Sequence, residues 1–269
     1  MPELPDVENY RRYLERYARR QVVKEIDIPD RRVLRRLPAS RFRERVLDAR
    51  MTSSRRHGKH LLVALDKGGW ITLHFGMTGA LVYGAAGSAT PAYARLGFRF
   101  SNGSYLAYVD PRMLGHIGFA EDADQFVAAE KLGSDALDPK LTLAAFRELL
   151  ASSRGNAKSF LMDQSRIAGV GNIYADEILF QARIHPEMPV RQLKPEQLAR
   201  LYAGMRRVLK ISIARGAGSE NFVDRLPVNY LLRHRDKGDH CPRCGSTIQT
   251  LRMAGRTTYF CPRCQRLRG

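Results

Sequence analysis

Four cysteines near the C-terminal end constrain the fold of this chain more than any other feature. They form two Cys-Pro-Arg-Cys knuckles, Cys241 to Cys244 and Cys261 to Cys264, with sixteen residues between them. Two such knuckles at this separation predict a tetrahedral four-cysteine zinc site. A redox pair or an iron–sulfur centre is the alternative, and paired proline-containing knuckles in a basic chain disfavour it. With every ligand position filled by protein, the one zinc ion is expected to be structural.

The segment between the knuckles is too short to bury a core of its own. Residues 247–260 alternate in a way that predicts a hairpin, with Ala254, Gly255 and Arg256 at its tip. Zinc binding would supply the folding free energy of such a module. The hairpin would then present Arg256 to a ligand, and an ordinary exposed turn residue is the alternative interpretation.

The charge of the chain points to a polyanionic partner. Among 269 residues, 45 are Lys or Arg and 27 are Asp or Glu, which gives a net charge of +18 and a pI near 10.2. Basic residues occur along the whole chain, which suits phosphate binding. We find no signal peptide, lipidation motif or apolar run of about 18 residues, so nucleic acid is expected as the partner and no membrane. Cysteines confined to the knuckles predict a reducing, cytoplasmic location.

The N-terminus, Met1-Pro2-Glu3-Leu4-Pro5-Asp6, contains a candidate nucleophile. Removal of Met1 would leave Pro2 with a secondary amine, and a free α-amino group has a pKa of roughly 8. Such an amine can attack a sugar carbon and form an iminium. Glu3, one peptide away, is placed to act as an acid or base. The alternative is that Pro2 is merely the residue after the start codon.

Hydrophobic periodicity divides the chain into three parts. Residues 6–21 repeat as a helix, residues 22–119 show period-two strands typical of a β-sandwich or barrel, and helical patterns follow from residue 122. Residues 85–94 are predicted to be a loop. We expect domains at 1–120, 121–236 and 237–269, the last of them the zinc finger.

Four short motifs have both a structural and a functional interpretation. His74 to Gly79 and Asp110 to Gly115 follow strands and are turns by default, while Lys59 could carry a phosphate contact on a sheet edge. Gly169 to Asn172 is predicted to be a tight turn between two helices. Its backbone N–H groups, with Asn172, would alternatively grip a phosphate.

Six motifs in this order resemble the formamidopyrimidine-DNA glycosylase and endonuclease VIII (Fpg/Nei) family over essentially the whole chain. They are PELPDVE, RHGKHLL, HFGMTG, DPR, LMDQSRIAGVGNIYADEILFQARIHP and GRTTYFCPRCQ. The resemblance implies an α+β multidomain fold. An N-terminal helix and β-sandwich are followed by a helical helix-two-turn-helix domain and a four-cysteine zinc finger.

The resemblance also implies a bifunctional DNA glycosylase and AP lyase of base-excision repair. Such enzymes excise oxidised bases, of the formamidopyrimidine or 8-oxoguanine type, from bent duplex DNA with the damaged nucleotide flipped out. Pro2 would attack the sugar C1′ and form a Schiff base, Glu3 would protonate the sugar ring oxygen, and β,δ-elimination would cut the strand. The chain is expected to act as a monomer on damaged double-stranded DNA, associated with the nucleoid.

The resemblance assigns a role to each further site residue. Lys59, which we group with the catalytic residues, would form a phosphate clamp with Asn172 and Arg256. Met77 and Arg112 would fill the space left by the flipped base, and Lys158 would handle the base itself. Zinc would be bound by Cys241, Cys244, Cys261 and Cys264.

Departures from the family pattern leave the preferred lesion open. Asp6 replaces the usual Glu, Met113-Leu114 replaces a basic residue and phenylalanine, and residues 216–238 follow the lesion-covering loop only in part. The alternatives are a Nei-like preference for oxidised pyrimidines or abasic sites, and a damaged-DNA binder without catalysis. A zinc-ribbon transcription or RNA-binding module would leave the N-terminal motif unused.

Overall fold

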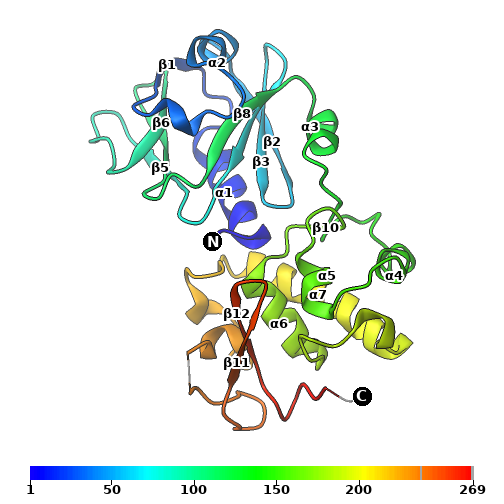
Figure 1. Cartoon of the computed structure of the whole chain (residues 1–269). Helices are drawn as coiled ribbons and strands as arrows, with labels where there is room; N and C mark the ends of the chain where they lie inside the picture. The colour runs from blue at the N-terminus through cyan, green and yellow to red at the C-terminus, as the bar shows by residue number, and fades with distance from the viewer. Residues whose placement is uncertain (237, 268–269) are drawn as a thin grey trace. The chain divides into compact units, whose positions relative to one another are not determined.

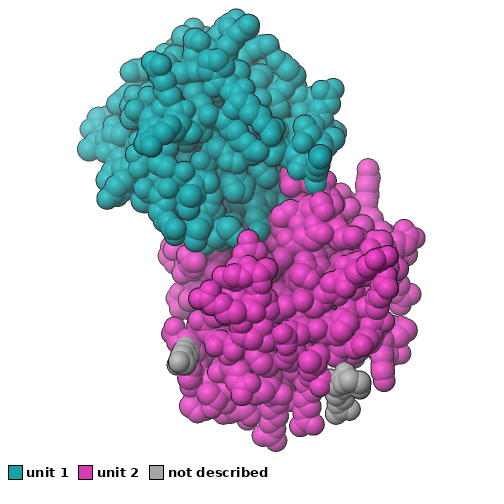
Figure 2. Space-filling view, viewed as in Figure 1, with its two compact units in different colours: residues 1–2, 6–131 teal, residues 3–5, 132–269 magenta. Residues whose placement is uncertain are grey.

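The computed structural model describes residues 1–236 and 238–267 (Figure 1). Two compact units are distinguished in Figure 2: residues 1–2 with 6–131, and residues 3–5 with 132–269. The first residue of the predicted zinc-finger segment, Lys237, and its last two residues lie outside the described residues. The first unit thus holds Pro2, while the second holds Glu3.

The first unit begins with the predicted N-terminal helix. Helix α1 spans Leu4–Tyr17, so it starts and ends earlier than the predicted 6–21. Pro5 is tolerated there because the first turn of a helix needs no N–H donor from that position. Val7 and Leu14 are buried on one face, as the helical spacing predicted. The helix ends before Arg20, whose φ of 66° lies in the left-handed region.

Two antiparallel four-stranded sheets make up most of the first unit (Figure 1). Both sheets contribute to a single buried core, which includes Leu61, Ile71, Phe98 and Leu106. This arrangement confirms the β-sandwich. One sheet has the order β1 (Val23–Asp27), β6 (Ala94–Phe100), β7 (Tyr105–Val109) and β5 (Ala80–Gly84), and the other β2 (Met51–His57), β3 (His60–Leu65), β4 (Trp70–His74) and β8 (His116–Ala120).

Short elements complete this unit. Helix α2 (Ala39–Val46) buries Phe42 and Val46, and helix α3 (Ala123–Ala129) is capped by the Asp122 carboxylate, while η1 spans Arg31–Val33. Strand β5 ends at Gly84 and β6 begins at Ala94. The loop predicted for residues 85–94 is therefore confirmed.

Helices dominate the second unit, as predicted from residue 122 onward. Helix α6 is buried on almost every side, whereas α7 buries the stripe Leu198, Leu201, Met205 and Val208. Both contribute to the core of this unit. The helices are α4 (Leu143–Ala151), α5 (Ala157–Met162), α6 (Asn172–Ala182) and α7 (Pro195–Ala214), with short turns η2 (Val190–Gln192), η3 (Val223–Arg225) and η4 (Leu231–His234) and a parallel pair β9 (Ser134–Asp135) and β10 (Ile167–Ala168).

The C-terminal hairpin has the predicted form. Strands β11 (Gln249–Met253) and β12 (Arg256–Phe260) pair antiparallel around the two-residue turn Ala254-Gly255. Both turn residues have positive φ, at 46° and 74°, as a two-residue hairpin of the primed type requires. Across the described ranges 1–236 and 238–267, no helix has the length and apolar content needed to cross a bilayer.

Candidate functional site

Glu3 is held by the N-terminus of helix α6. Its carboxylate is fully buried and accepts hydrogen bonds from the backbone N–H groups of Gly171 at 2.6 Å, Ile173 at 2.8 Å and Tyr174 at 3.3 Å. These N–H groups have no partner within the helix, and the helix dipole favours a negative charge at this end. The carboxylate of Glu3 is therefore fixed in position.

The turn before α6 is shaped to receive the N-terminal segment. Gly169 has a φ of 116° and its carbonyl accepts from the Leu4 N–H at 3.1 Å. A Cβ on Gly171 would lie 2.4 Å from the carboxyl carbon of Glu3. The predicted tight turn is confirmed. Of the turn N–H groups considered for phosphate binding, that of Gly171 donates to Glu3 and that of Gly169 donates to the Gln164 side chain in this structure.

Pro2 is the covalent neighbour of this anchored carboxylate. The residue is half-buried, and in the full sequence its nitrogen is bonded to Met1. Since the peptide bond to Glu3 limits the distance between the two residues, fixing Glu3 restricts where Pro2 can be. Removal of Met1 would convert the proline nitrogen into a basic amine.

Asp176 is the centre of a buried ionic network. One carboxylate oxygen accepts from Lys158 Nζ at 2.6 Å, and the other accepts from Arg235 at 2.9 Å and from the Tyr259 N–H at 3.1 Å. Lys158 also donates to Thr258 Oγ1 at 2.6 Å. The network joins α5, α6 and β12, and we had predicted no role for Asp176 or Thr258.

Lys158, predicted to handle the base, is almost completely enclosed. Its exposed fraction is 1%, and burial lowers the pKa of its ammonium group. Lys158 and Arg256 nevertheless line the same hollow, of about 450 Å³. In this structure the ammonium group is therefore bound to Asp176 and Thr258. The Lys158 side chain lines a hollow that Arg256, next to the hairpin tip, also lines.

The structure brings two predicted phosphate-clamp residues together. Asn172, the first residue of α6, donates from Nδ2 to the Thr257 carbonyl at 3.1 Å. Arg256, the neighbour of Thr257, is exposed at the start of β12. Lys59 belongs to the first unit, in the two-residue turn between β2 and β3. Lys59 therefore lies on a hairpin turn and not along the edge of the sheet.

Met77 and Arg112 lie on two loops of the first unit that share one brace. The Asp110 carboxylate is fully buried and accepts from Thr78 Oγ1 at 2.6 Å, from the Gly115 N–H at 2.8 Å and from the Arg112 N–H at 3.2 Å. Asp110 thereby fixes both loops together. We predicted only a turn here; the tendency of Asp to bind nearby N–H groups in turns was the available signal.

The side chains on these loops extend outward. Met77 is 41% exposed and Leu114 is 48% exposed. Arg112 is exposed between them in sequence. Met113, by contrast, has a left-handed φ of 52° and packs against the core of the unit. Leu114 is thus the aliphatic wedge candidate of this loop.

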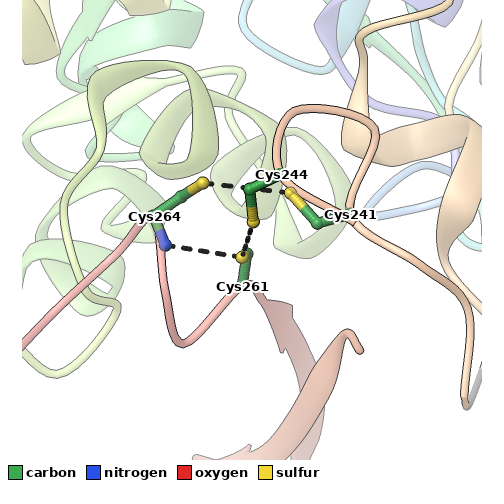
Figure 3. Close-up of side chains that lie close together, drawn as sticks. All are labelled: Cys241, Cys244, Cys261 and Cys264. Atoms are coloured by element: carbon green, nitrogen blue, oxygen red, sulfur yellow. Dashed lines mark hydrogen bonds between the residues drawn. The ribbon is translucent and has the colours of Figure 1, made fainter. Parts of the chain in front are cut away.

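The four cysteines converge at one point (Figure 3). Their sulfur atoms all lie within 4.8 Å of one another, and the Sγ atoms of Cys241 and Cys264 are 3.9 Å apart, those of Cys244 and Cys261 3.5 Å. Zn–S bonds of about 2.3 Å in a tetrahedron give S···S distances of roughly 3.8 Å. The residues therefore fit one zinc ion, as predicted. Gln265 ties the second knuckle to the segment after α6 through the Ile184 carbonyl.

Four histidines form a ladder across one sheet of the first unit. His57, His60, His74 and His116 are directly paired from β2 to β8. Ring centroids are 4.9 Å apart for His60 and His74, and 5.0 Å for His74 and His116. Burial lowers the pKa of both His74 and His116 to about 4. The expectation of a structural role for His74 agrees with this position.

Comparison with family models covers most of the chain. Residues 1–117 match the formamidopyrimidine-DNA glycosylase N-terminal domain, residues 132–224 the formamidopyrimidine-DNA glycosylase H2TH domain, and residues 238–267 the zinc finger found in FPG and IleRS. The three matches follow the chain in the order expected from the resemblance.

Similar proteins span the full length of the chain. A formamidopyrimidine-DNA glycosylase of Pelotomaculum thermopropionicum is 36% identical over all of both chains, and one of Synechococcus elongatus is 34% identical over 99% of this chain and 98% of its own.

Solved structures of similar proteins contain DNA. Lactococcus lactis Fpg with DNA containing N7-benzyl-Fapy-dG has a TM-score of 0.90 at 29% identity, covering 99% of this chain and all of its own. The same enzyme with DNA containing an abasic site has a TM-score of 0.87 at 27% identity, covering 98% of this chain and all of its own.

Proposed function

Because the chain belongs to the formamidopyrimidine-DNA glycosylase family, we propose that it is a bifunctional DNA glycosylase and AP lyase acting on oxidised bases in duplex DNA. The observation that carries the proposal is the anchoring of Glu3 by three N–H groups at the start of α6. It holds an acid–base group directly beside the only secondary amine that the N-terminus can supply. A protein that merely bound DNA would not need this arrangement.

The proposed reaction begins after Met1 is removed. The protonated Pro2 amine first gives a proton to Glu3, and its nitrogen then attacks C1′ of the damaged nucleotide. The bond between C1′ and the base nitrogen breaks, and the base leaves with the second proton of the amine. Glu3 donates its proton to the sugar ring oxygen, which opens the ring and leaves an iminium between Pro2 and C1′. The iminium makes the C2′ proton acidic. Its loss expels the 3′ phosphate, and a second elimination releases the 5′ phosphate.

The residues predicted to bind DNA have supporting positions within their own units. Asn172 and Arg256 are neighbours through the Thr257 carbonyl, which suits two contacts to adjacent backbone phosphates. Lys59 on its hairpin turn supplies a third. Met77, Arg112 and Leu114 on the braced loops suit insertion into the base stack, where apolar wedges fill the space of an extruded base.

Lys158 is proposed to sense the base rather than to grip it. Its Nζ already donates to Asp176 and Thr258, so at most one of its three N–H donors is left for a base. Zinc is proposed to hold β11 and β12 in place, with Cys241, Cys244, Cys261 and Cys264 as its ligands. The ion stabilises the hairpin that carries Arg256 and takes no part in the bond changes.

The proposed partner and organisation follow the same argument. We expect a monomer, associated with the nucleoid of the cytoplasm, with functional segments at 1–120, 121–236 and 237–269. Formamidopyrimidine and 8-oxoguanine lesions are the proposed substrates, because the relatives carry that name and two similar structures hold Fapy-dG DNA. A Nei-like preference for oxidised pyrimidines is the alternative, and duplexes with single defined lesions separate the two.

Borohydride trapping tests the proposal. The protein should form a covalent adduct with a duplex containing a formamidopyrimidine, and mass spectrometry should place the adduct on Pro2 of a chain that lacks Met1. Pro2→Gly and Glu3→Gln should each abolish base removal while leaving zinc content unchanged. Undiminished trapping by a chain that retains Met1 would refute the assignment.

A further inference from the structure

A strongly basic hollow lies at the end of α6 that is remote from the phosphate-clamp residue Asn172. Two adjoining cavities, of about 860 Å³ and 460 Å³, share four lining residues, Arg183, Arg263, Cys264 and Arg266. Helix α6 has 11 residues and is therefore about 16 Å long. Arg183 caps its C-terminal end, whereas Asn172 begins it. We call this region the basic hollow.

Cations outnumber anions in the basic hollow. Six cationic side chains line it, and Glu196 is the one carboxylate among the lining residues. None of the six forms a salt bridge with a carboxylate of residues 1–236 or 238–267. The six are Arg183, Lys194, Arg200, Arg243, Arg263 and Arg266.

Structural roles explain only part of this charge. Arg243 donates to the Phe180 carbonyl at 3.1 Å, and both it and Arg183 lie at the C-terminal end of α6, where cations are favourable. A zinc ion bound by four thiolates adds formally two negative charges beside the hollow. With Glu196 counted as well, a formal excess of three positive charges remains.

Lys194 adds a further positive charge to the basic hollow. It is the N-cap residue of α7, and Arg200 follows on that helix. The N-terminus of a helix carries a partial positive charge, which disfavours a cation there, and Glu196 in the first turn of α7 is the carboxylate that offsets it. Like charges around one concave surface lower the stability of the free protein. Such an arrangement is expected where an anionic ligand binds.

The lining residues indicate which kind of anion the basic hollow binds. Five of the six cations are arginines, whose guanidinium groups bind phosphate in a bidentate manner. Met188, the one large aliphatic side chain of the lining, is 4% exposed. An acidic protein segment would need an apolar anchor at the centre of its interface. A phosphodiester backbone needs none.

We propose that the basic hollow binds the phosphodiester backbone of DNA, as a site separate from Asn172 and Arg256. The DNA comes either from the flank of the duplex that carries the lesion or from a second duplex. Such a site keeps the protein on undamaged DNA during the search for lesions. It rests on DNA as the partner in the proposed function, but it makes no use of the chemistry.

The test measures affinity for intact DNA as a function of salt. The triple variant Arg183→Gln, Arg200→Gln, Arg266→Gln spares the knuckle arginines, and its zinc content is checked first. For an intact 30-bp duplex, the slope of log K against log[NaCl] should fall in magnitude by about 2 to 3, because each lost phosphate contact removes about 0.9. A matched control removes three exposed arginines of the first unit, Arg31→Gln, Arg41→Gln and Arg99→Gln.

Two arms distinguish the sources of the DNA. If the basic hollow binds the flank of the duplex that carries the lesion, the triple variant has a changed salt slope on a 30-bp duplex but not on a 12-bp duplex. If it holds a second duplex, the wild-type protein captures a labelled duplex on an immobilised one and the triple variant does not. Equal slopes for the triple variant and the control on every duplex would overturn the proposal. A second result would also overturn the proposal. In it, the wild-type protein binds polyglutamate, the triple variant does not, and the two proteins have the same salt slope on DNA.

These readouts use undamaged DNA. They therefore remain informative if lesion excision itself is not observed. Conversely, a triple variant with wild-type excision on the 12-bp duplex would show that the basic hollow is independent of the active site.

Discussion

The Nζ atom of Lys158 lies 2.6 Å from a carboxylate oxygen of Asp176, and both side chains are buried. The second oxygen of Asp176 accepts from Arg235 and from the Tyr259 N–H. One anion thus links α5, α6, the segment after η4 and the zinc-finger hairpin. Within the second unit, this carboxylate sets the place of β12 relative to α6.

Replacing the buried anion should destabilise the protein strongly. Asp176→Asn leaves Lys158 and Arg235 without a counter-charge, and breaking a buried ion pair on one side costs about 3–5 kcal/mol. The unfolding free energy from urea titration checks this. Asp124→Asn is the control, because Asp124 pairs with Arg55 on the surface and its side chain is 79% exposed. The unfolding free energy of Asp124→Asn should fall by less than about 1 kcal/mol. Equal losses for Asp124→Asn and Asp176→Asn would contradict the role of Asp176.

A methyl group at Gly171 should disable the active site. Its Cβ would lie 2.4 Å from the carboxyl carbon of Glu3, so Gly171→Ala must displace the carboxylate that we propose as the catalytic acid–base group. We expect the single-turnover rate of base removal to fall by more than about a hundredfold, within the range that acid–base groups contribute. Gly204→Ala in α7 is the control, since its Cβ would have no contact closer than 3.7 Å. A Gly171→Ala protein with wild-type rates would show that the position of Glu3 is unimportant.

The shared brace of the two exposed loops predicts a coupled effect on DNA binding. Asp110→Asn replaces an acceptor of three hydrogen bonds with an amide that presents only one oxygen. Affinity for a duplex with an abasic-site analogue should fall about tenfold or more, corresponding to one charged hydrogen bond. Met77→Ala and Leu114→Ala should each weaken binding less in the Asp110→Asn background than in the wild type. Purely additive effects would argue against the coupling.

The histidine ladder predicts a loss of stability in acid. Burial lowers the pKa of His74 and His116 to about 4, and Arg35 adds to the shift in both. The pKa of His60 is lowered as well, by burial and by His74, His116, His57 and Arg35. Lys59 acts in the same direction on His74, Arg36 on His116, while Glu130 acts in the opposite direction on His74.

The direction in which pH changes the unfolding free energy follows from proton binding. Unfolded histidines bind protons below pH 6.5, whereas these rings in the folded protein stay neutral down to about pH 4. The unfolding free energy should therefore fall as the pH falls from 6.5 toward 4, by up to about 1.4 kcal/mol per pH unit for each histidine. Urea titrations at pH 7, 6 and 5 measure the slope. His74→Gln should reduce it, and the surface-turn variant His234→Gln should not.

Removing the zinc ion should uncouple the hairpin from the rest of the second unit. Cys264→Ser or chelation removes the bonds between zinc and the cysteines that hold β11 and β12. The remaining core around Phe180, Leu231 and the cysteines is small, so it cannot replace those bonds. DNA affinity should then fall to the level of Arg256→Ala. Zinc is counted by mass spectrometry of the native protein, and full DNA affinity at zero zinc would contradict the role of the ion.

The sequence alone determined the elements and the chemistry of this protein. Local patterns carry that information: helical spacing predicted the N-terminal helix, alternation predicted the strands of the first unit, and paired CxxC knuckles predicted the metal site. The family motifs supplied the candidate residues from Pro2 to Arg256.

Only the tertiary structure decided which groups meet. The N–H groups of Gly171, Ile173 and Tyr174 at the start of α6 hold Glu3, Asp110 joins two loops, and Asp176 binds cations from distant segments. The four histidines align because strands far apart in the chain share one register. Buried polar groups must find partners wherever the packed chain offers them, so their pairings depend on the whole fold and not on neighbouring residues.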